Sequence, residues 1–228
     1  MPNGFDLSVI VPALNAAAAL PQSLAAVRAC PDVAQVIVSD GGSADGTVEA
    51  ARQAGAQVVT AARGRGAQMA AGAGAAVAPW LLFLHADTVL QPGWSVAARA
   101  FMDDPAHADH AGYFSLRFDD DAPAARRLER IVAWRCRWLA LPYGDQGLLI
   151  RRAVYERIGG FRPLPIMEDV DLIQRIPRTA RIGLDGVALT SARRYRQEGY
   201  LMRPARNVIC QAFWRLGVPA VTVARWYR

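Results

Sequence analysis

The chain has 228 residues, a hydrophobic fraction of 53% and a formal net charge of +6. This length suits one domain, or one domain with a small appendage, and the composition can fill a sizeable core. No uninterrupted run approaches the roughly 20 apolar residues that a membrane-spanning helix needs. The acidic Asp6 precedes the first apolar run, so we expect no secretory signal peptide.

The basic side chains are all arginines, and they are unevenly distributed. Residues 1–100 contain 5 arginines and 6 acidic residues, a charge of −1, whereas residues 101–228 contain 21 arginines and 14 acidic residues, a charge of +7. Arginine-rich surfaces favour phosphate, anionic lipid or nucleic acid. Because the arginines are scattered over several predicted elements without a binding motif, we expect no nucleic-acid partner.

The cysteines Cys30, Cys136 and Cys210 lie far apart, and no Cys-x-x-Cys pair occurs. This spacing indicates neither a disulfide framework nor a zinc knuckle. Free cysteines are usually buried, and they persist in reducing compartments. We therefore expect buried free thiols and a cytoplasmic protein.

The first hundred residues alternate between predicted strands and helices. Apolar runs rich in β-branched residues predict strands, and apolar residues three or four positions apart predict helices. The predicted strands are residues 7–12, 35–39, 57–60 and 80–84, and the predicted helices are 17–29, 48–54 and a glycine-led segment at 63–71. This alternation predicts an α/β domain with parallel strands and helices on both faces of the sheet.

The rest of the chain is less regular. Strands are predicted at 112–118 and 147–150, and helices at 94–102, 119–139, 152–158 and from Glu168 to near Pro177. Residues 203–228 have helical composition, broken near Gly217 and Pro219, and mix arginines with large apolar residues. This last segment either packs on the domain with its arginines outside or lies in a membrane interface, on the inner face of the membrane.

Polar residues follow the predicted strands of the first half. The fourth strand ends in Phe83-Leu-His-Ala-Asp87, and the earlier strands lead to Asn15, Asp40 and Arg63. In an open α/β sheet, ligands bind outside the carboxyl ends of the strands. We therefore predict that Asp87, with His85, holds a divalent metal under a charged substrate. The alternative is that Asp87 only caps the following turn.

Four other segments carry polar signals of this kind. The turn after Asp40 either brings that carboxylate to a nucleobase or is a plain loop that the Asp caps. The glycine-rich, basic Arg63-Gly-Arg-Gly segment precedes a helix, where backbone amides favour phosphate. Glu168 and Asp169 begin a helix. A carboxylate held there can act as a general base, and the alternative is that both acids only complement the helix dipole. Gly144-Asp145-Gln146 is either a turn or a ligand site.

In this order, five segments resemble glycosyltransferase family 2, whose members are inverting enzymes of the GT-A fold that use nucleotide-diphospho-sugars. The segments are Val11–Asn15, Asp40–Thr47, Phe83–Asp87, Gly159–Phe161 and Glu168–Leu172, and they span most of residues 7–175. The order of five motifs is far more specific than any one of them. The chain looks closest to small, single-domain bacterial members whose metal motif begins with His.

The resemblance implies a Rossmann-like, mostly parallel central sheet and a role for each matching position. Residues 1–202 would form the GT-A domain, with a nucleotide-binding half at 1–100 and an acceptor half at 101–202, followed by an amphipathic helical tail at 203–228. Asp169 would be the catalytic base, and Asp87 and His85 would bind Mn²⁺ or Mg²⁺. Asp145, Gln146 and Glu168 would lie near the acceptor. The donor would contact Pro12, Ala13, Asn15, Asp40, Gly41, Gly42, Arg63, Gln68 and Ala86.

One position departs from the family pattern, because the metal motif is usually Asp-x-Asp and here begins with His85. Mg²⁺ prefers oxygen ligands and His suits Mn²⁺ better, which favours Mn²⁺. The predicted reaction moves a sugar from a UDP-sugar to a hydroxyl acceptor. One alternative is a sugar-phosphate nucleotidyltransferase, which would need a glycine-rich basic loop where this chain has Pro12-Ala-Leu-Asn15. The other is a non-catalytic protein that binds a membrane surface.

Overall fold

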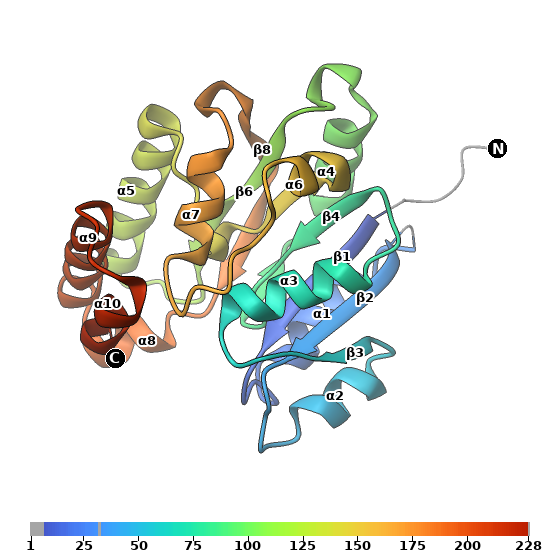
Figure 1. Ribbon diagram of the computed structural model, residues 1–228, viewed down its shortest axis with the longest axis horizontal. Coiled ribbons are helices and arrows are strands. Elements are labelled where there is room, and N and C mark those ends of the chain that lie inside the picture. Colours follow the sequence, from blue (N-terminus) through green and yellow to red (C-terminus); the bar gives the residue numbers. More distant parts are fainter. Residues whose placement is uncertain (1–6, 32, 228) are drawn as a thin grey trace.

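The structure, a computed structural model, describes residues 7–31 and 33–227. A curved sheet runs through the molecule, with helices on both faces (Figure 1). Its strands are β1 Leu7–Ala13, β2 Val33–Asp40, β3 Gln57–Thr60, β4 Trp80–Phe83, β5 Thr88–Leu90, β6 Ala111–Phe118, β7 Leu148–Arg151 and β8 Arg181–Thr190. The order across the sheet is β3-β2-β1-β4-β7-β6-β8-β5.

The α-helices are α1 Leu20–Arg28, α2 Thr47–Gln53, α3 Arg65–Ala75, α4 Trp94–Asp103, α5 Pro123–Leu139, α6 Arg152–Arg157, α7 Glu168–Arg175, α8 Arg193–Glu198, α9 Met202–Arg215 and α10 Ala220–Tyr227. Short 3₁₀ turns lie at Pro105–His107, Gly144–Gln146 and Arg178–Ala180. The strands and helices predicted from the sequence are present, with shifted ends. None of the helices in the described part of the chain is long and apolar enough to cross a membrane.

The sheet is parallel where strand and helix alternate and mixed beyond that point. β3, β2, β1 and β4 pair in parallel, as the alternating pattern predicts, and β6 pairs in parallel with β8. β7 runs antiparallel to both β4 and β6, and β5 runs antiparallel to β8. The result is the mostly parallel α/β sheet that was predicted.

The two faces of the sheet bury separate cores because side chains alternate along each strand. Val9 and Val11 of β1 pack with α1, α2 and α4, whereas Ile10 packs with α3, α6 and α7. A third cluster joins β6 to α5. Cys30, Cys136 and Cys210 are free and buried, as expected.

Strands β5 and β8 and helix α8 were missed by the sequence reasoning. β8 contains Gly183, Asp185 and Gly186, which have low strand preference. It is a strand because β6 and β5 pair with it on its two edges. Gly186 also fits its surroundings, since a Cβ there would lie 2.9 Å from the Phe114 ring. Long-range pairing and packing, which a local pattern does not report, decide this element.

The C-terminal tail folds as two helices that break where Gly217 and Pro219 predicted. Cys210 of α9 and Val223 of α10 are buried against Ile166, Met167 and Val170. The tail therefore packs on the domain, which is one of the two interpretations of its sequence. It packs at the start of α7, where Glu168 and Asp169 lie.

Helix α3 begins in close contact with the segment that precedes α7. A Cβ on Gly66 would collide with the carbonyl oxygen of Arg162 and lie 3.1 Å from the Leu164 nitrogen. Gly74, in the same helix, has no atom within 4 Å of its Cβ position. Only a residue without a side chain lets the start of α3 approach this backbone.

We predict that Gly66→Ala lowers the free energy of unfolding by about 1–3 kcal/mol, because the added methyl group must displace backbone. Gly74→Ala is the matched control, and it should raise the free energy of unfolding by up to about 1 kcal/mol through helix propensity. Urea unfolding of the two variants measures both effects. A Gly66→Ala protein as stable as Gly74→Ala would contradict the close contact.

Candidate active site

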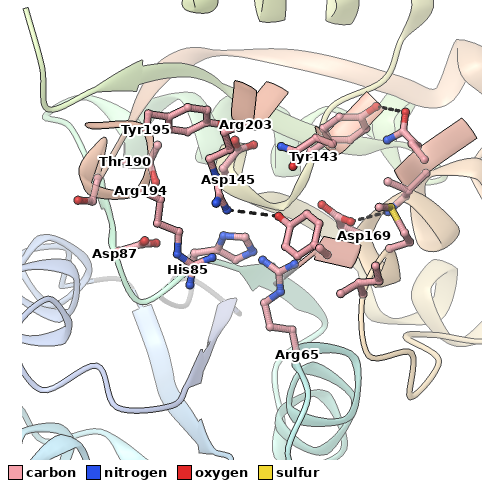
Figure 2. Close-up of a pocket in the computed structure, with 17 residues that line it drawn as sticks. Arg65, His85, Asp87, Tyr143, Asp145, Asp169, Thr190, Arg194, Tyr195 and Arg203 are labelled. Atoms are coloured by element: carbon pink, nitrogen blue, oxygen red, sulfur yellow. Dashed lines mark hydrogen bonds between the residues drawn. The ribbon is translucent and has the colours of Figure 1, made fainter. Parts of the chain in front are cut away.

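A cavity opens at the sheet edge where β4 and β8 end and β7 begins (Figure 2). It brings together His85 and Asp87 after β4, Asp145 before β7 and Asp169 at the start of α7. The other lining residues are Arg65, Tyr143, Ile166, Met167, Val170, Thr190, Ser191, Arg194, Tyr195, Arg203, Asn207, Gln211 and Tyr227. Four predicted site residues, far apart in the sequence, thus share one cavity.

The His-Ala-Asp turn is held against the end of β8. The Ser191 N–H donates to the Asp87 carbonyl oxygen at 3.1 Å, and the Thr88 N–H donates to the His85 carbonyl oxygen at 3.1 Å. The Thr88 and Thr190 hydroxyls are 3.0 Å apart in the buried layer below. Short β5 therefore fixes the turn and brings the residues that follow β8 beside Asp87.

His85 presents an unused nitrogen. Its Nε2 is buried and has no hydrogen-bond partner. Burial, and after it the positive charge of Arg65, lowers the pKa of His85 to about 4. The imidazole is therefore neutral at physiological pH and keeps a lone pair, which is the form that binds metals.

The donor set of His85 and Asp87 fits a divalent cation. The Asp87 carboxylate is exposed at the cavity rim, so oxygen and nitrogen ligands stand on one turn. Within the described residues, no group of three or more His, Cys, Asp or Glu side chains is placed to hold a metal. The remaining ligands would have to come from the substrate or from water, and the mixed set suits Mn²⁺ better than Mg²⁺.

Asp169 is held in a fixed orientation by backbone amides. Its Oδ2 accepts a hydrogen bond from the Gly144 N–H at 2.9 Å, and its Oδ1 accepts from the Val170 N–H at 2.8 Å. A Cβ on Gly144 would lie 2.6 Å from His85 Nε2 and 3.4 Å from Asp169 Oδ2. Gly144 therefore lets one loop contact both the predicted base and the predicted metal ligand.

The two other acidic candidates differ in their surroundings. Burial raises the pKa of Asp145 to about 6; the charge of Arg135 opposes this shift and the charge of Asp169 adds to it. The Oδ1 atom of Asp145 has no hydrogen-bond partner. Glu168 is fully buried and turned toward α3, where its Oε1 lies 2.7 Å from Arg65 Nε. Asp145 therefore faces the cavity, whereas Glu168 supports its wall.

Two arginines in the cavity, Arg65 and Arg194, were not singled out from the sequence. Figure 2 shows both guanidinium groups directed toward the region of His85. Their charges both lower the pKa of His85. The sequence does carry a signal for Arg65, because it belongs to the basic, glycine-rich segment that was expected to favour phosphate. Arg63 is the predicted residue of that segment, but its side chain is exposed and lies outside the cavity. Arg194 follows β8, which was itself missed.

The predicted nucleotide residues lie outside this cavity, at or after the carboxyl ends of β1 to β4 and, for Gln68, on α3. The Asp40 carboxylate is buried and accepts hydrogen bonds from the Gly42 and Ser43 N–H groups, both at 3.0 Å. The Asn15 side chain accepts from the Ala44 N–H at 2.9 Å. These contacts close the turn after β2. The remaining residues of this group are Pro12, Ala13, Gly41, Gly42, Arg63 and Ala86, none of which lines the cavity.

Both predicted glutamine ligands have structural hydrogen bonds. Gln68 donates to the carbonyl oxygens of Ala13, at 2.5 Å, and Ser39, at 3.0 Å, and so joins the ends of β1 and β2. Gln146 is buried and donates to the Phe114 carbonyl oxygen at 3.0 Å. The donor contact of Gln68 and the acceptor contact of Gln146 stay predictions.

Comparison with known proteins matches residues 8–165 to the family model described as "Glycosyl transferase family 2". Glucosyl-3-phosphoglycerate synthase from Mycobacterium tuberculosis, solved with Mn²⁺, UDP and glucosyl-3-phosphoglycerate, is similar with a TM-score of 0.66 and 21% identity, over 93% of this chain and 80% of that chain. A structure of that synthase with Mg²⁺ and UDP has a TM-score of 0.64 and 21% identity to this chain, and the match covers 93% of this chain and 80% of that chain.

Mannosyltransferase PcManGT from Pyrobaculum calidifontis, solved with GDP-Man and Mn²⁺, is similar with a TM-score of 0.66 and 19% identity, over 91% of this chain and 61% of that chain. The comparison with curated proteins gives no match. The solved structures confirm the GT-A fold. The family match covers the segments that carry Arg65, His85, Asp87 and Asp145, and it ends before Asp169. The chain is thus a glycosyltransferase, and it belongs to glycosyl transferase family 2.

Proposed function

We propose that the chain transfers a sugar, with inversion, from a UDP-sugar to the hydroxyl group of an acceptor. The observation that carries this proposal is the convergence of Asp87, His85 and Asp169 on one cavity. The structural neighbours that contain UDP with Mn²⁺ or Mg²⁺ support the choice of donor and cofactor. The family match gives no support to the nucleotidyltransferase or to the non-catalytic alternative.

The metal side of the site is the turn after β4. Asp87 and His85 would hold Mn²⁺ or Mg²⁺, which supplies neutralisation of the charge that develops on the leaving diphosphate. Arg65 and Arg194 bring two further positive charges to the same cavity. They bind the diphosphate and stabilise its charge from the protein side.

The acceptor side of the site is formed by Asp169 and its neighbours. Asp169 accepts the proton of the acceptor hydroxyl while the oxygen forms a bond to the anomeric carbon and the bond from that carbon to the diphosphate breaks. The amides of Gly144 and Val170 orient the carboxylate for this transfer. Asp145 and the α9 residues Asn207 and Gln211 line the same cavity and orient the acceptor.

The nucleotide extends from the cavity along the sheet edge. β1, β2 and β4 are adjacent parallel strands, and their carboxyl ends lie at the same edge of the sheet. Asn15 and Asp40 therefore lie at the same edge as the His-Ala-Asp turn. Residues 1–100 form the donor half under this proposal, and residues 101–202 form the acceptor half. The tail, assigned to 203–228, completes the acceptor side through α9.

Asp169→Asn should lower the rate of sugar transfer by about 10²- to 10⁴-fold, because the amide is nearly isosteric but does not accept the proton. Binding of the sugar nucleotide should be unchanged. The control is Asp185→Asn, which alters an exposed carboxylate on β8 outside the cavity. Transfer assays and nucleotide titrations measure the two effects, and full activity of Asp169→Asn would refute the role of the base.

Asp87→Asn should weaken the dependence of nucleotide binding on the metal. In a thermal-shift panel, UDP with Mn²⁺ should stabilise the wild type, by roughly 2.7 kcal/mol at 100 times the dissociation constant. UDP without metal, and GDP with metal, should stabilise it less. The Asp87→Asn protein should show no added effect of Mn²⁺, and Asp185→Asn should behave as wild type. Stronger stabilisation by GDP than by UDP would overturn the choice of UDP as the nucleotide, and it would leave the proposed sugar transfer in place.

Glu168 makes stability depend on pH. Burial raises its pKa from 4.5 to about 7, although Arg65 opposes the shift. Between these values the folded chain binds more protons than the unfolded chain, so stability falls as pH rises from about 4.5 to about 7. In the wild type the free energy of unfolding should fall by on the order of 1–3 kcal/mol over this pH range, and Glu168→Gln should remove that fall. Urea unfolding at several pH values, with the exposed Glu156→Gln as control, tests this; an unchanged pH profile would contradict it.

A further inference from the structure

Helix α5 carries a stripe of exposed apolar and basic residues. Its inner side packs Leu128, Val132 and Cys136 against β6. On its outer side, Ile131, Trp134 and Trp138 are 55%, 57% and 62% exposed. The exposed Arg127, Arg130 and Arg137 alternate with them at helical spacing. Two exposed tryptophans on one helix face are unusual on a surface in contact with water only.

Helix α9 has a second such face. Arg203, Asn207 and Gln211 face the cavity, and Cys210 is buried. The outer side exposes the large apolar residues Val208, Ile209, Phe213 and Leu216. The Phe213 ring contacts the ring of Trp226 on α10, 5.3 Å between centroids, and Trp226 is half exposed. One helix thus joins the cavity to an apolar outer surface.

The unpaired charges on these two faces have one sign, because the nearby acids Asp121 and Glu198 are each paired with an arginine. No acidic residue occurs from Gly199 to Arg228. The acidic residue inside α5, Glu129, is buried and paired with Arg117 and Arg126. In the described residues, Arg215 and Arg225 have no ion pair, nor do the three exposed arginines of α5. The outer faces are therefore apolar and positively charged.

Figure 1 shows α5, α9 and α10 gathered at one end of the molecule. We propose that this end binds the surface of a bilayer that contains anionic phospholipid. Tryptophan and long apolar side chains enter the interface between head groups and acyl chains, and arginines bind the lipid phosphates. A second copy of the chain fits poorly as occupant, because two such faces would bring their unpaired arginines together. Nucleic acid would leave the apolar side chains unused.

Vesicle flotation of the full chain tests the proposal. The wild type should float with vesicles of phosphatidylcholine and phosphatidylglycerol and bind pure phosphatidylcholine more weakly. Val208→Asp should reduce binding by about tenfold, because it places an acid in the apolar face. The matched control is Val96→Asp on α4, which alters a valine of similar exposure, 72% against 66%, outside these faces. Equal losses for the two variants, or no binding by wild type, would overturn the proposal.

A second variant replaces Arg127, Arg130 and Arg137 with Gln and leaves every apolar side chain in place. It should lose about fivefold in affinity for anionic vesicles per arginine and keep its weak binding to neutral vesicles. Circular dichroism confirms that each variant is folded. Light scattering gives the competing outcome: a wild-type dimer that Val208→Asp dissociates would assign the face to a second copy of the chain and refute the bilayer. None of these measurements depends on sugar transfer.

Discussion

The contact between the start of α3 and the segment before α7 determines the geometry of the site. Glu168 is fully buried, and its carboxylate is compensated by Arg65 at 2.7 Å. A buried charge without such a partner is strongly destabilising. Gly66 permits the approach, since any side chain there would meet the Arg162 carbonyl. The contact between Arg65 and Glu168 therefore ties the parallel half of the sheet to the helix that carries Asp169.

The cavity is a consequence of how the second half of the chain closes on the first. β7 lies antiparallel beside β4, so the loop before β7 meets the turn after β4, and Gly144 contacts both His85 and Asp169. β8 and β5 bring Ser191 to the backbone of Asp87. These two walls thus depend on strand pairings between distant segments. This explains why the proposed metal ligands, the proposed base and the arginines Arg65 and Arg194 meet in one cavity although no short motif contains them all.

The tail contributes to two surfaces through the two sides of α9. Its inner side buries Cys210 against the start of α7 and presents Asn207 and Gln211 to the cavity. Its outer side is apolar and carries no acid. Met167, at the boundary, has φ of 65° and is buried in the same cluster as Cys210. Packing of the tail therefore supports a backbone conformation that few non-glycine residues adopt and that precedes Glu168 and Asp169.

The sequence by itself determined the α/β class, the parallel first half and the candidate role of Asp87, because strand periodicity and polar residues at strand ends are local patterns. The candidate role of Asp169 came from the order of the motifs that resemble the family. Only the tertiary structure decided that Arg65 and not Arg63 enters the cavity, and that Asp40 and Gln68 bond to their own strand ends. It also decided that β8 is a strand and that Arg194 and α9 complete the site. These outcomes depend on side-chain direction and long-range pairing, which spacing along the chain does not encode.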